Sequence, residues 1–192
     1  MCPMSSNGVL DKLLGGSYRV RLLRLFLLNP DTSFEPKIIA QKTKVKGSSL
    51  RRELIALRNI GFVKKAGKGL RLSRSFEFLD PLKNLLLSTE PFKDEEIVNR
   101  FKGGGAMKCL VVSGVFTQNP QARIDVLLVG DRLKRGKIER ALRDMESEIG
   151  RELSYAIFET PEFKYRMEVY DKFIRDVFDY PHRVLLDKIG VL

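Results

Sequence analysis

Hydrophobic and polar residues in the first third of the chain follow the spacing of helices. Residues 17–29 form a dense apolar run interrupted by arginines, and Pro30 ends this predicted helix because the residue before a proline avoids helical geometry. A second helix is predicted over residues 35–42, with Pro36 in the first turn, where a proline is tolerated. Residues 1–10 lack such a pattern and are predicted to be a loose tail.

A third helix is predicted after the short polar turn at residues 43–47. Ser48 or Ser49 can cap its first turn with a side-chain oxygen. Hydrophobic residues then recur at spacings of four, three and three, which predicts one buried stripe: Leu50, Leu54, Leu57 and Ile60. Two short strands and a glycine-containing turn follow over residues 62–73 and predict a β-hairpin. Residues 76–87 are apolar enough for a further packed segment or helix.

The second half of the chain alternates helices and strands. Its patterns predict helices over residues 94–101, 134–149 and 169–178, a short helix from 160, and strands over 108–116, 123–129, 153–158 and 184–186. This order is typical of a small α/β domain. The whole chain is predicted to be an α+β protein with two domains, residues 11–90 and residues 91–192.

The composition is that of a globular protein, because 43% of the 192 residues are hydrophobic and 31% are charged. The apolar runs fall far short of the roughly 20 residues of a membrane-spanning helix, and residues 1–10 lack the features of a secretory signal. Two cysteines, Cys2 and Cys109, are too few for a disulfide framework or a four-ligand zinc site. We therefore expect a cytoplasmic protein with reduced thiols and without a metal, a cofactor or a membrane partner.

The net charge of +11 is concentrated in one half of the chain. Residues 1–90 contain 17 lysines and arginines against 7 acidic residues, whereas residues 91–192 contain 18 against 17. A charge that served solubility alone would be spread over both halves. The one-sided excess indicates a polyanionic partner for the first domain, most simply nucleic acid.

Residues 17–75 resemble the winged helix-turn-helix superfamily in the order and lengths of their predicted elements, and residues 48–63 are similar to the third helix and first wing strand of many bacterial and archaeal regulators. The resemblance implies that this helix enters the major groove of double-stranded DNA with its N-terminal end nearest the bases. Serines and arginines at that end, with lysines before the helix and on the hairpin, suit contacts with bases and phosphates. Lys42 and Lys44 add to the cations before the helix. The candidate DNA-binding residues are Lys46, Ser48, Ser49, Arg51, Arg52, Lys64, Lys65, Lys68 and Arg71.

Residues 92–190 resemble the minimal nucleotidyltransferase domains, through residues 112–116, 122–129 and 159–186. In active members of that family, a Gly-Ser pair follows the first strand, two aspartates one residue apart lie on the second strand, and a third carboxylate lies on a later strand. Carboxylates arranged in this way hold a divalent metal that bridges the nucleotide phosphates.

This chain departs from the family pattern at its metal-binding positions. Gly114 is kept, but Val115 replaces the serine, Arg123 replaces the first aspartate, and only Asp125 matches the second. The strand predicted over residues 153–158 contains no carboxylate. We therefore expect a catalytically degenerate domain in which Asp125 is a structural partner of Arg123.

The resulting hypothesis is a DNA-binding transcriptional regulator whose second domain senses a ligand or mediates assembly. A nucleotide or other small molecule is one candidate ligand, and a homodimer is one candidate assembly. Two alternatives stay open. One is an active nucleotidyltransferase that modifies a protein, a nucleotide or an RNA, and the other is a scaffold whose winged helix binds protein.

Overall fold

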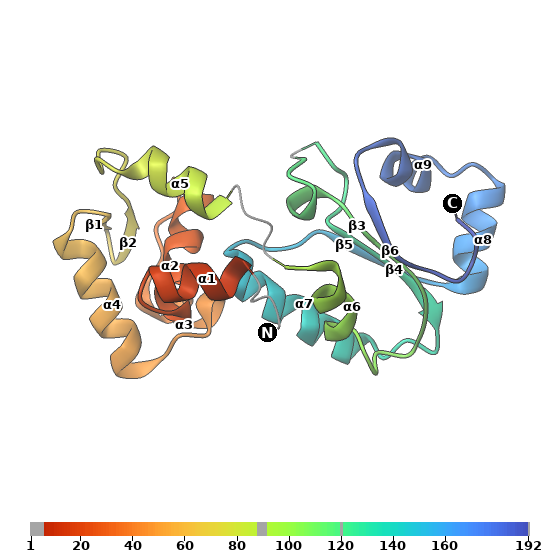
Figure 1. Ribbon diagram of the computed structural model, residues 1–192, viewed down its shortest axis with the longest axis horizontal. Coiled ribbons are helices and arrows are strands. Elements are labelled where there is room, and N and C mark those ends of the chain that lie inside the picture. Colours follow the sequence, from red (N-terminus) through yellow and green to blue (C-terminus); the bar gives the residue numbers. More distant parts are fainter. Residues whose placement is uncertain (1–5, 88–91, 120, 192) are drawn as a thin grey trace. The chain divides into compact units, whose positions relative to one another are not determined.

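The computed structural model of the chain describes residues 6–87, 92–119 and 121–191 (Figure 1). Its helices are combined with a two-stranded antiparallel sheet and a four-stranded mixed sheet, so the protein belongs to the predicted α+β class. Contacts between residues divide the chain into two units. The first unit comprises the described residues up to 87 together with 144–152, and the second comprises the other described residues.

The first unit consists of helices around a short hairpin: α1 (Ser6–Leu13), α2 (Ser17–Leu28), α3 (Pro36–Thr43), α4 (Gly47–Asn59), β1 (Val63–Ala66), β2 (Gly69–Leu72) and α5 (Leu79–Leu87). The first, second and third predicted helices correspond to α2, α3 and α4, and these helices and both predicted strands are confirmed, because their periodicity already reflects the face that each one buries. The tail predicted over residues 1–10 is wrong from Ser6 onward, where α1 begins, and Leu10 is buried. Residues 1–5 lie outside the described residues.

An aromatic cluster holds the hairpin against α2. The ring of Phe26 lies edge-on to the rings of Phe34 and Phe62, at centroid distances of 6.1 and 6.4 Å, and all three rings are buried. Phe34 also exchanges two backbone hydrogen bonds of 2.9 Å with Leu70 of β2. Gly69 permits this close approach, since a Cβ there would lie 2.6 Å from the carbonyl oxygen of Phe34. The hairpin is thus fixed to the helical core along β2.

The predicted capping of α4 by serine is wrong. The N-cap residue is Lys46, which has extended backbone and makes no side-chain cap hydrogen bond, so Ser48 and Ser49 lie inside the first turn. The preceding turn sets this start, because Lys44 takes left-handed backbone with φ 57° and Val45 N donates a hydrogen bond to the hydroxyl of Thr43.

The predicted burial of Ile60 is also wrong. Helix α4 ends at Asn59, and Ile60 is 61% exposed. Glu53 instead joins Leu50, Leu54 and Leu57 on the buried side of the helix. Its carboxylate accepts a hydrogen bond of 2.8 Å from Arg19 Nε, so the buried charge is paired.

Residues 144–152 pack against α2 through buried polar contacts within the first unit. The guanidinium of Arg24, a residue only 3% exposed, donates hydrogen bonds to the carbonyl oxygens of Glu148 and Leu86. Burial is the main cause that lowers the pKa of Arg24 below its usual value. Gly150 has φ +94°, and a Cβ there would lie 2.7 Å from the carbonyl carbon of Arg24. A glycine is therefore required where this segment meets α2.

The second unit contains α6 (Asp94–Arg100), β3 (Ala106–Val112), a short 3₁₀ turn η1 (Gly114–Phe116), β4 (Val126–Asp131), most of α7 (Arg135–Ile149), β5 (Tyr155–Glu159), α8 (Thr160–Glu168), α9 (Lys172–Asp179) and β6 (Arg183–Asp187). The strand order in its sheet is β5-β4-β3-β6. Strands β4 and β5 are parallel and are joined through α7, whereas β3 pairs antiparallel with both β4 and β6. The predicted order of helices and strands is confirmed.

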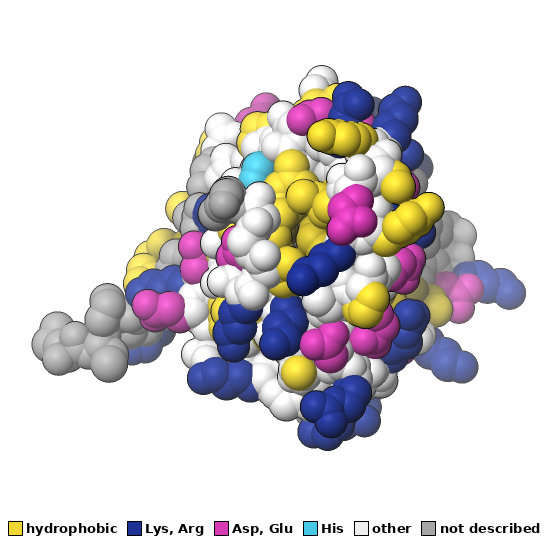
Figure 2. All heavy atoms as spheres, turned by 90° about the vertical axis from the view of Figure 1, so that its right-hand side faces the viewer, with side chains coloured by type: hydrophobic (Ala, Val, Ile, Leu, Met, Phe, Trp, Pro, Cys, Tyr) yellow, Lys and Arg dark blue, Asp and Glu magenta, His cyan; other side chains and the backbone are white. Residues whose placement is uncertain are grey.

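Side chains of this sheet alternate between two covered faces. Val111 and Leu127 point to the face where α8 and α9 contribute Phe163, Ile174 and Val177. Figure 1 shows α6 and α7 on the opposite side of the sheet. In Figure 2, apolar side chains gather at the centre of the face that carries α8 and α9, with charged side chains around them. The partly buried apolar residues that pack there are Ala156, Phe158, Phe173, Phe178, Val184, Ile189 and Val191.

Candidate functional site

Helix α4 and the β1–β2 hairpin carry the basic residues that the sequence singles out for DNA. Lys46 lies at the N-cap of α4, Arg51 and Arg52 lie in the helix, and the remaining cations lie on the hairpin: Lys64, Lys65, Lys68 and Arg71. All are exposed except Arg71, which is half-buried. Over the described part of the chain, Arg52 makes a long contact of 3.9 Å with Glu53, and no ion pair involves the other six. Their charges are available to a partner.

Two neighbouring lysines are neutralised within the first unit. Lys42 Nζ lies 2.8 Å from the carboxylate of Glu152, and Lys44 pairs with Asp144. The hydrogen bond and charge of Lys42 lower the pKa of the Glu152 carboxyl below its ordinary value. These lysines are close in sequence to the candidate DNA-facing cations, but their acidic partners come from a distant part of the chain. Of Lys42, Lys44 and Lys46, the last has no ion pair among the described residues.

The register of the hairpin divides its cations between two faces. Lys64 lies opposite Arg71, and Lys65 lies opposite Leu70. Since neighbouring residues on a strand point to opposite faces, Lys64 and Arg71 share one face of the hairpin. Lys65 shares the other face with Leu70, which packs against the core. The sequence alone does not reveal this division.

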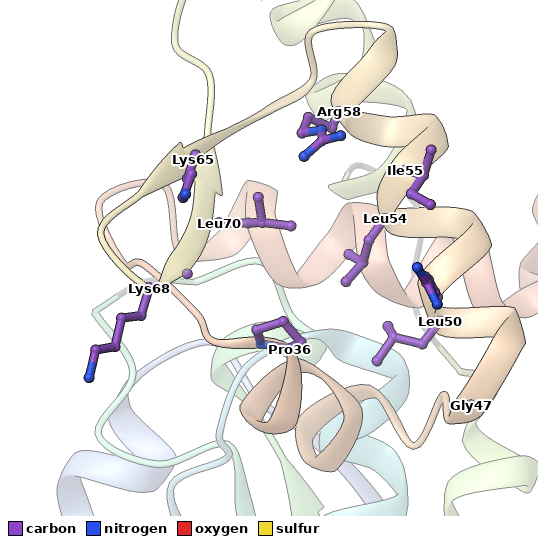
Figure 3. A pocket seen from close by; sticks show the side chains of 11 residues that line it. Pro36, Gly47, Leu50, Leu54, Ile55, Arg58, Lys65, Lys68 and Leu70 are labelled. Carbon is purple, nitrogen blue, oxygen red and sulfur yellow. The ribbon is translucent and has the colours of Figure 1, made fainter.

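A groove separates α4 from the hairpin on the side of Lys65 (Figure 3). Its volume is about 610 Å³. Arg51, Ile55 and Arg58 line it from α4 at positions that share one side of a helix. The remaining lining residues are Pro36, Gly47, Leu50, Leu54, Lys65, Lys68, Gly69 and Leu70. The spacing of Arg51, Ile55 and Arg58 signals a shared side, but the groove itself depends on where the hairpin packs.

In the second unit, Asp125 holds two loops together rather than facing an open site. Asp125 is only 2% exposed. Its two carboxylate oxygens accept hydrogen bonds from Val115 N at 2.8 Å and Ser154 N at 2.9 Å. Gly114 has φ +58°, and a Cβ there would overlap the carboxylate of Asp125. A glycine at position 114 thus has a steric reason in this chain.

The sequence predicts Asp125 as the partner of Arg123, whereas the structure places Arg123 beside Asp176. Arg123 Nη1 lies 2.8 Å from the carboxylate of Asp176, and its guanidinium lies 5.9 Å from the ring centroid of Phe173. Both motif residues precede β4, which begins at Val126 rather than at residue 123. They therefore do not lie on the strand, where residues two apart would share one face.

The described residues contain neither a metal-ligand cluster nor a membrane-spanning helix. No group of three or more histidine, cysteine or acidic side chains is arranged to hold a metal ion in that part of the chain. None of its helices has the length and apolar character needed to cross a bilayer. The single histidine, His182, is half-buried, and its Nδ1 lies 2.8 Å from the carbonyl oxygen of Tyr180.

Comparison with known proteins adds no relative from which a function could be transferred. The chain matches no protein-family model, no curated protein and no solved structure.

Proposed function

We propose that the first unit binds double-stranded DNA as a winged helix-turn-helix and that the chain is a transcriptional regulator. The observation that carries this proposal is the difference between two groups of neighbouring cations. Lys42 and Lys44 are matched by acidic residues, whereas the cations on α4 and the hairpin have no ion pair among the described residues apart from the 3.9 Å contact of Arg52 with Glu53. DNA supplies a dense row of phosphates for such cations, and their neutralisation releases bound counterions.

The arrangement of α4 supports its assignment as the reading helix. Leu50, Leu54 and Leu57 are buried against the core, whereas Ser48 and Arg52 are exposed on other sides of the helix. A helix that enters the major groove needs one anchored face and one polar face, with base contacts near its N-terminal end. Arginine there can pair with guanine, and serine can donate to a phosphate.

The second unit is proposed to be a nucleotidyltransferase-like domain that transfers no nucleotide and instead senses a ligand or mediates assembly. Metal-dependent transfer needs several anionic ligands that converge on one cation. Both oxygens of Asp125 accept backbone hydrogen bonds, and Arg123 brings a positive charge to the first ligand position of the motif. These contacts support a structural role for the motif residues.

The first experiment measures the affinity of the full chain for a labelled random-sequence DNA duplex over a range of salt concentrations. If all seven lysines and arginines of the candidate set met phosphates, log Kd would rise with log salt with a slope of about 6. Lys46→Ala is expected to reduce the slope by about 1. Lys42→Ala is the matched control, because that ammonium already pairs with Glu152, and it should leave the slope nearly unchanged.

Arg51→Ala and Arg52→Ala test the reading helix itself. Each is expected to weaken specific binding by about 1–3 kcal/mol if its side chain pairs with a base, with unchanged circular dichroism because both residues are exposed. Absence of duplex binding at low salt would favour the scaffold alternative. Metal-dependent release of pyrophosphate from a nucleoside triphosphate by the wild-type chain would favour the nucleotidyltransferase alternative.

A further inference from the structure

The groove between α4 and the hairpin has an apolar floor that DNA binding leaves unexplained. Leu54 of α4 and Leu70 of β2 point toward each other across it, and Pro36 lies beyond them (Figure 3). Ile55, which is 44% exposed, lies along the α4 side. A phosphate backbone is matched by cations and hydrogen-bond donors rather than by leucine, isoleucine and proline side chains. The floor therefore suits a different kind of molecule.

Positive charge is gathered around this floor. Arg51, Arg58, Lys65 and Lys68 line the groove, and no acidic side chain joins them among the described residues. Figure 3 shows Arg58 and Lys65 near one end of the groove, and Pro36, Leu50 and Lys68 nearer the other. Arg58 and Lys65 thus flank one end of the apolar floor, and Arg51 and Lys68 add positive charge toward the other end.

We propose that this groove binds an amphipathic carboxylate, that is, a small molecule with an unbranched or aromatic apolar body and one anionic head. Arg58 and Lys65 hold the carboxylate, and the apolar body lies along Leu54 and Leu70. The volume of about 610 Å³ lies in the range of small-molecule sites, which are mostly apolar with a few polar groups that fix the ligand's orientation. Leu50 and Arg58 are eight residues apart on α4, which corresponds to about 12 Å of helix, so a medium-length chain fits along it.

The ligand site and the proposed DNA face share residues. Arg51, Lys65 and Lys68 line the groove and also belong to the candidate DNA-binding set. A bound carboxylate would neutralise part of their charge, so it is expected to weaken duplex binding. Binding of the carboxylate itself does not depend on DNA binding, and only this competition rests on the proposed function.

The probe is sodium decanoate, titrated calorimetrically into the full chain, with acetate as the head-only control and 1-decanol as the tail-only control. Methyl NMR spectra locate the site, and the expected shifts are at Leu54, Ile55 and Leu70. Decanoate should bind at least tenfold more tightly than acetate or decanol, while circular dichroism stays unchanged. Absence of saturable binding, or shifts confined to methyl groups outside the groove, overturns the proposal.

Two variants with the same charge change test the head-group contact. Arg58→Glu is expected to weaken decanoate binding by about tenfold or more, the effect of losing one hydrogen bond between charged groups. Lys83→Glu lies on α5 at an exposed position outside the lining and should change the affinity less than twofold. Equal affinities of the two variants would refute the site. Ile55→Asn, at an exposed position, should weaken decanoate binding without affecting acetate.

The competition experiment separates the two proposals. Decanoate is added to a complex of the chain with a labelled duplex, and wild-type protein should release the duplex at lower decanoate concentrations than Arg58→Glu. If decanoate binds in the groove but the chain binds no duplex, the proposed function fails and the ligand site stands. If the duplex binds and decanoate does not, the ligand site fails and the proposed function stands.

Discussion

Replacement of Asp125 by alanine distinguishes a structural aspartate from a metal ligand. The wild-type carboxylate accepts hydrogen bonds from Val115 N and Ser154 N, and the residue is 2% exposed. The alanine side chain offers neither acceptor, so both N–H groups lose this partner in a place that water reaches poorly. A metal ligand in a metal-free protein would behave differently, because removing one of several converging carboxylates relieves repulsion between them.

The size of the expected loss follows from the two hydrogen bonds. A buried donor left without its acceptor costs about 1–3 kcal/mol, so two donors give a loss of about 2–6 kcal/mol. That is a large part of the roughly 5–15 kcal/mol by which a typical protein is stable. Asp125→Asn keeps one acceptor oxygen and directs an NH₂ group at the other donor, so it should fall between wild type and Asp125→Ala.

The assay is unfolding in urea followed by far-ultraviolet circular dichroism, with and without magnesium. Asp179→Ala is the matched control, because Asp179 ends α9 at an exposed position, and it should shift the free energy of unfolding by no more than about 0.5 kcal/mol. Magnesium should not change the difference between wild type and Asp125→Ala. A loss no larger than that of the control, or a loss that appears only with magnesium, would refute the structural role.

Three further predictions concern other parts of the chain. Gly150→Ala should lower the free energy of unfolding, measured in urea, by about 2–4 kcal/mol, because its Cβ would lie 2.7 Å from the backbone of α2 at a positive φ. Gly136→Ala is the control, because the new Cβ has no atom within 4 Å. It should be neutral or slightly stabilising. Lys42→Ala should raise the pKa of Glu152 toward its ordinary value of 4.5 in an NMR titration, since Lys42 lowers it. The pKa of Glu152 is lower in the folded protein than in the unfolded chain. The stabilisation by this ion pair is therefore fully present above the ordinary carboxyl pKa and is lost as the pH falls through the lowered pKa. An unchanged pKa of Glu152 in Lys42→Ala would contradict the pairing. Burial, together with the negative charge of Asp187, raises the pKa of the Cys109 thiol to about 12. In a Cys2→Ser variant, a thiol reagent at pH 8 should therefore react with Cys109 only after unfolding in urea. Rapid labelling of the native protein would contradict this prediction.

The sequence by itself determines the order of helices and strands and most of their positions. The local signals are of two kinds. The apolar stripe of α4 shows the side that the helix must bury. The proline after α2 and the glycine-containing hairpin turn mark where elements end or reverse direction. The uneven distribution of lysine and arginine between the two halves of the chain is equally visible without a structure. These patterns do not indicate that residues 144–152 belong to the first unit.

Tertiary structure alone decides which charges are matched and which positions are buried. Lys42 and Lys46 look equivalent in the sequence, yet Glu152 arrives from 110 residues away to pair with Lys42. Glu53 is buried although it is charged, because Arg19 supplies a partner for its carboxylate. Ile60 is exposed although it is hydrophobic, because α4 ends before it. Such outcomes depend on long-range packing, which brings together groups that no local spacing relates. The division of the hairpin cations and the groove beside α4 have the same origin, since strand register and helix packing, rather than composition, set which side chains face each other.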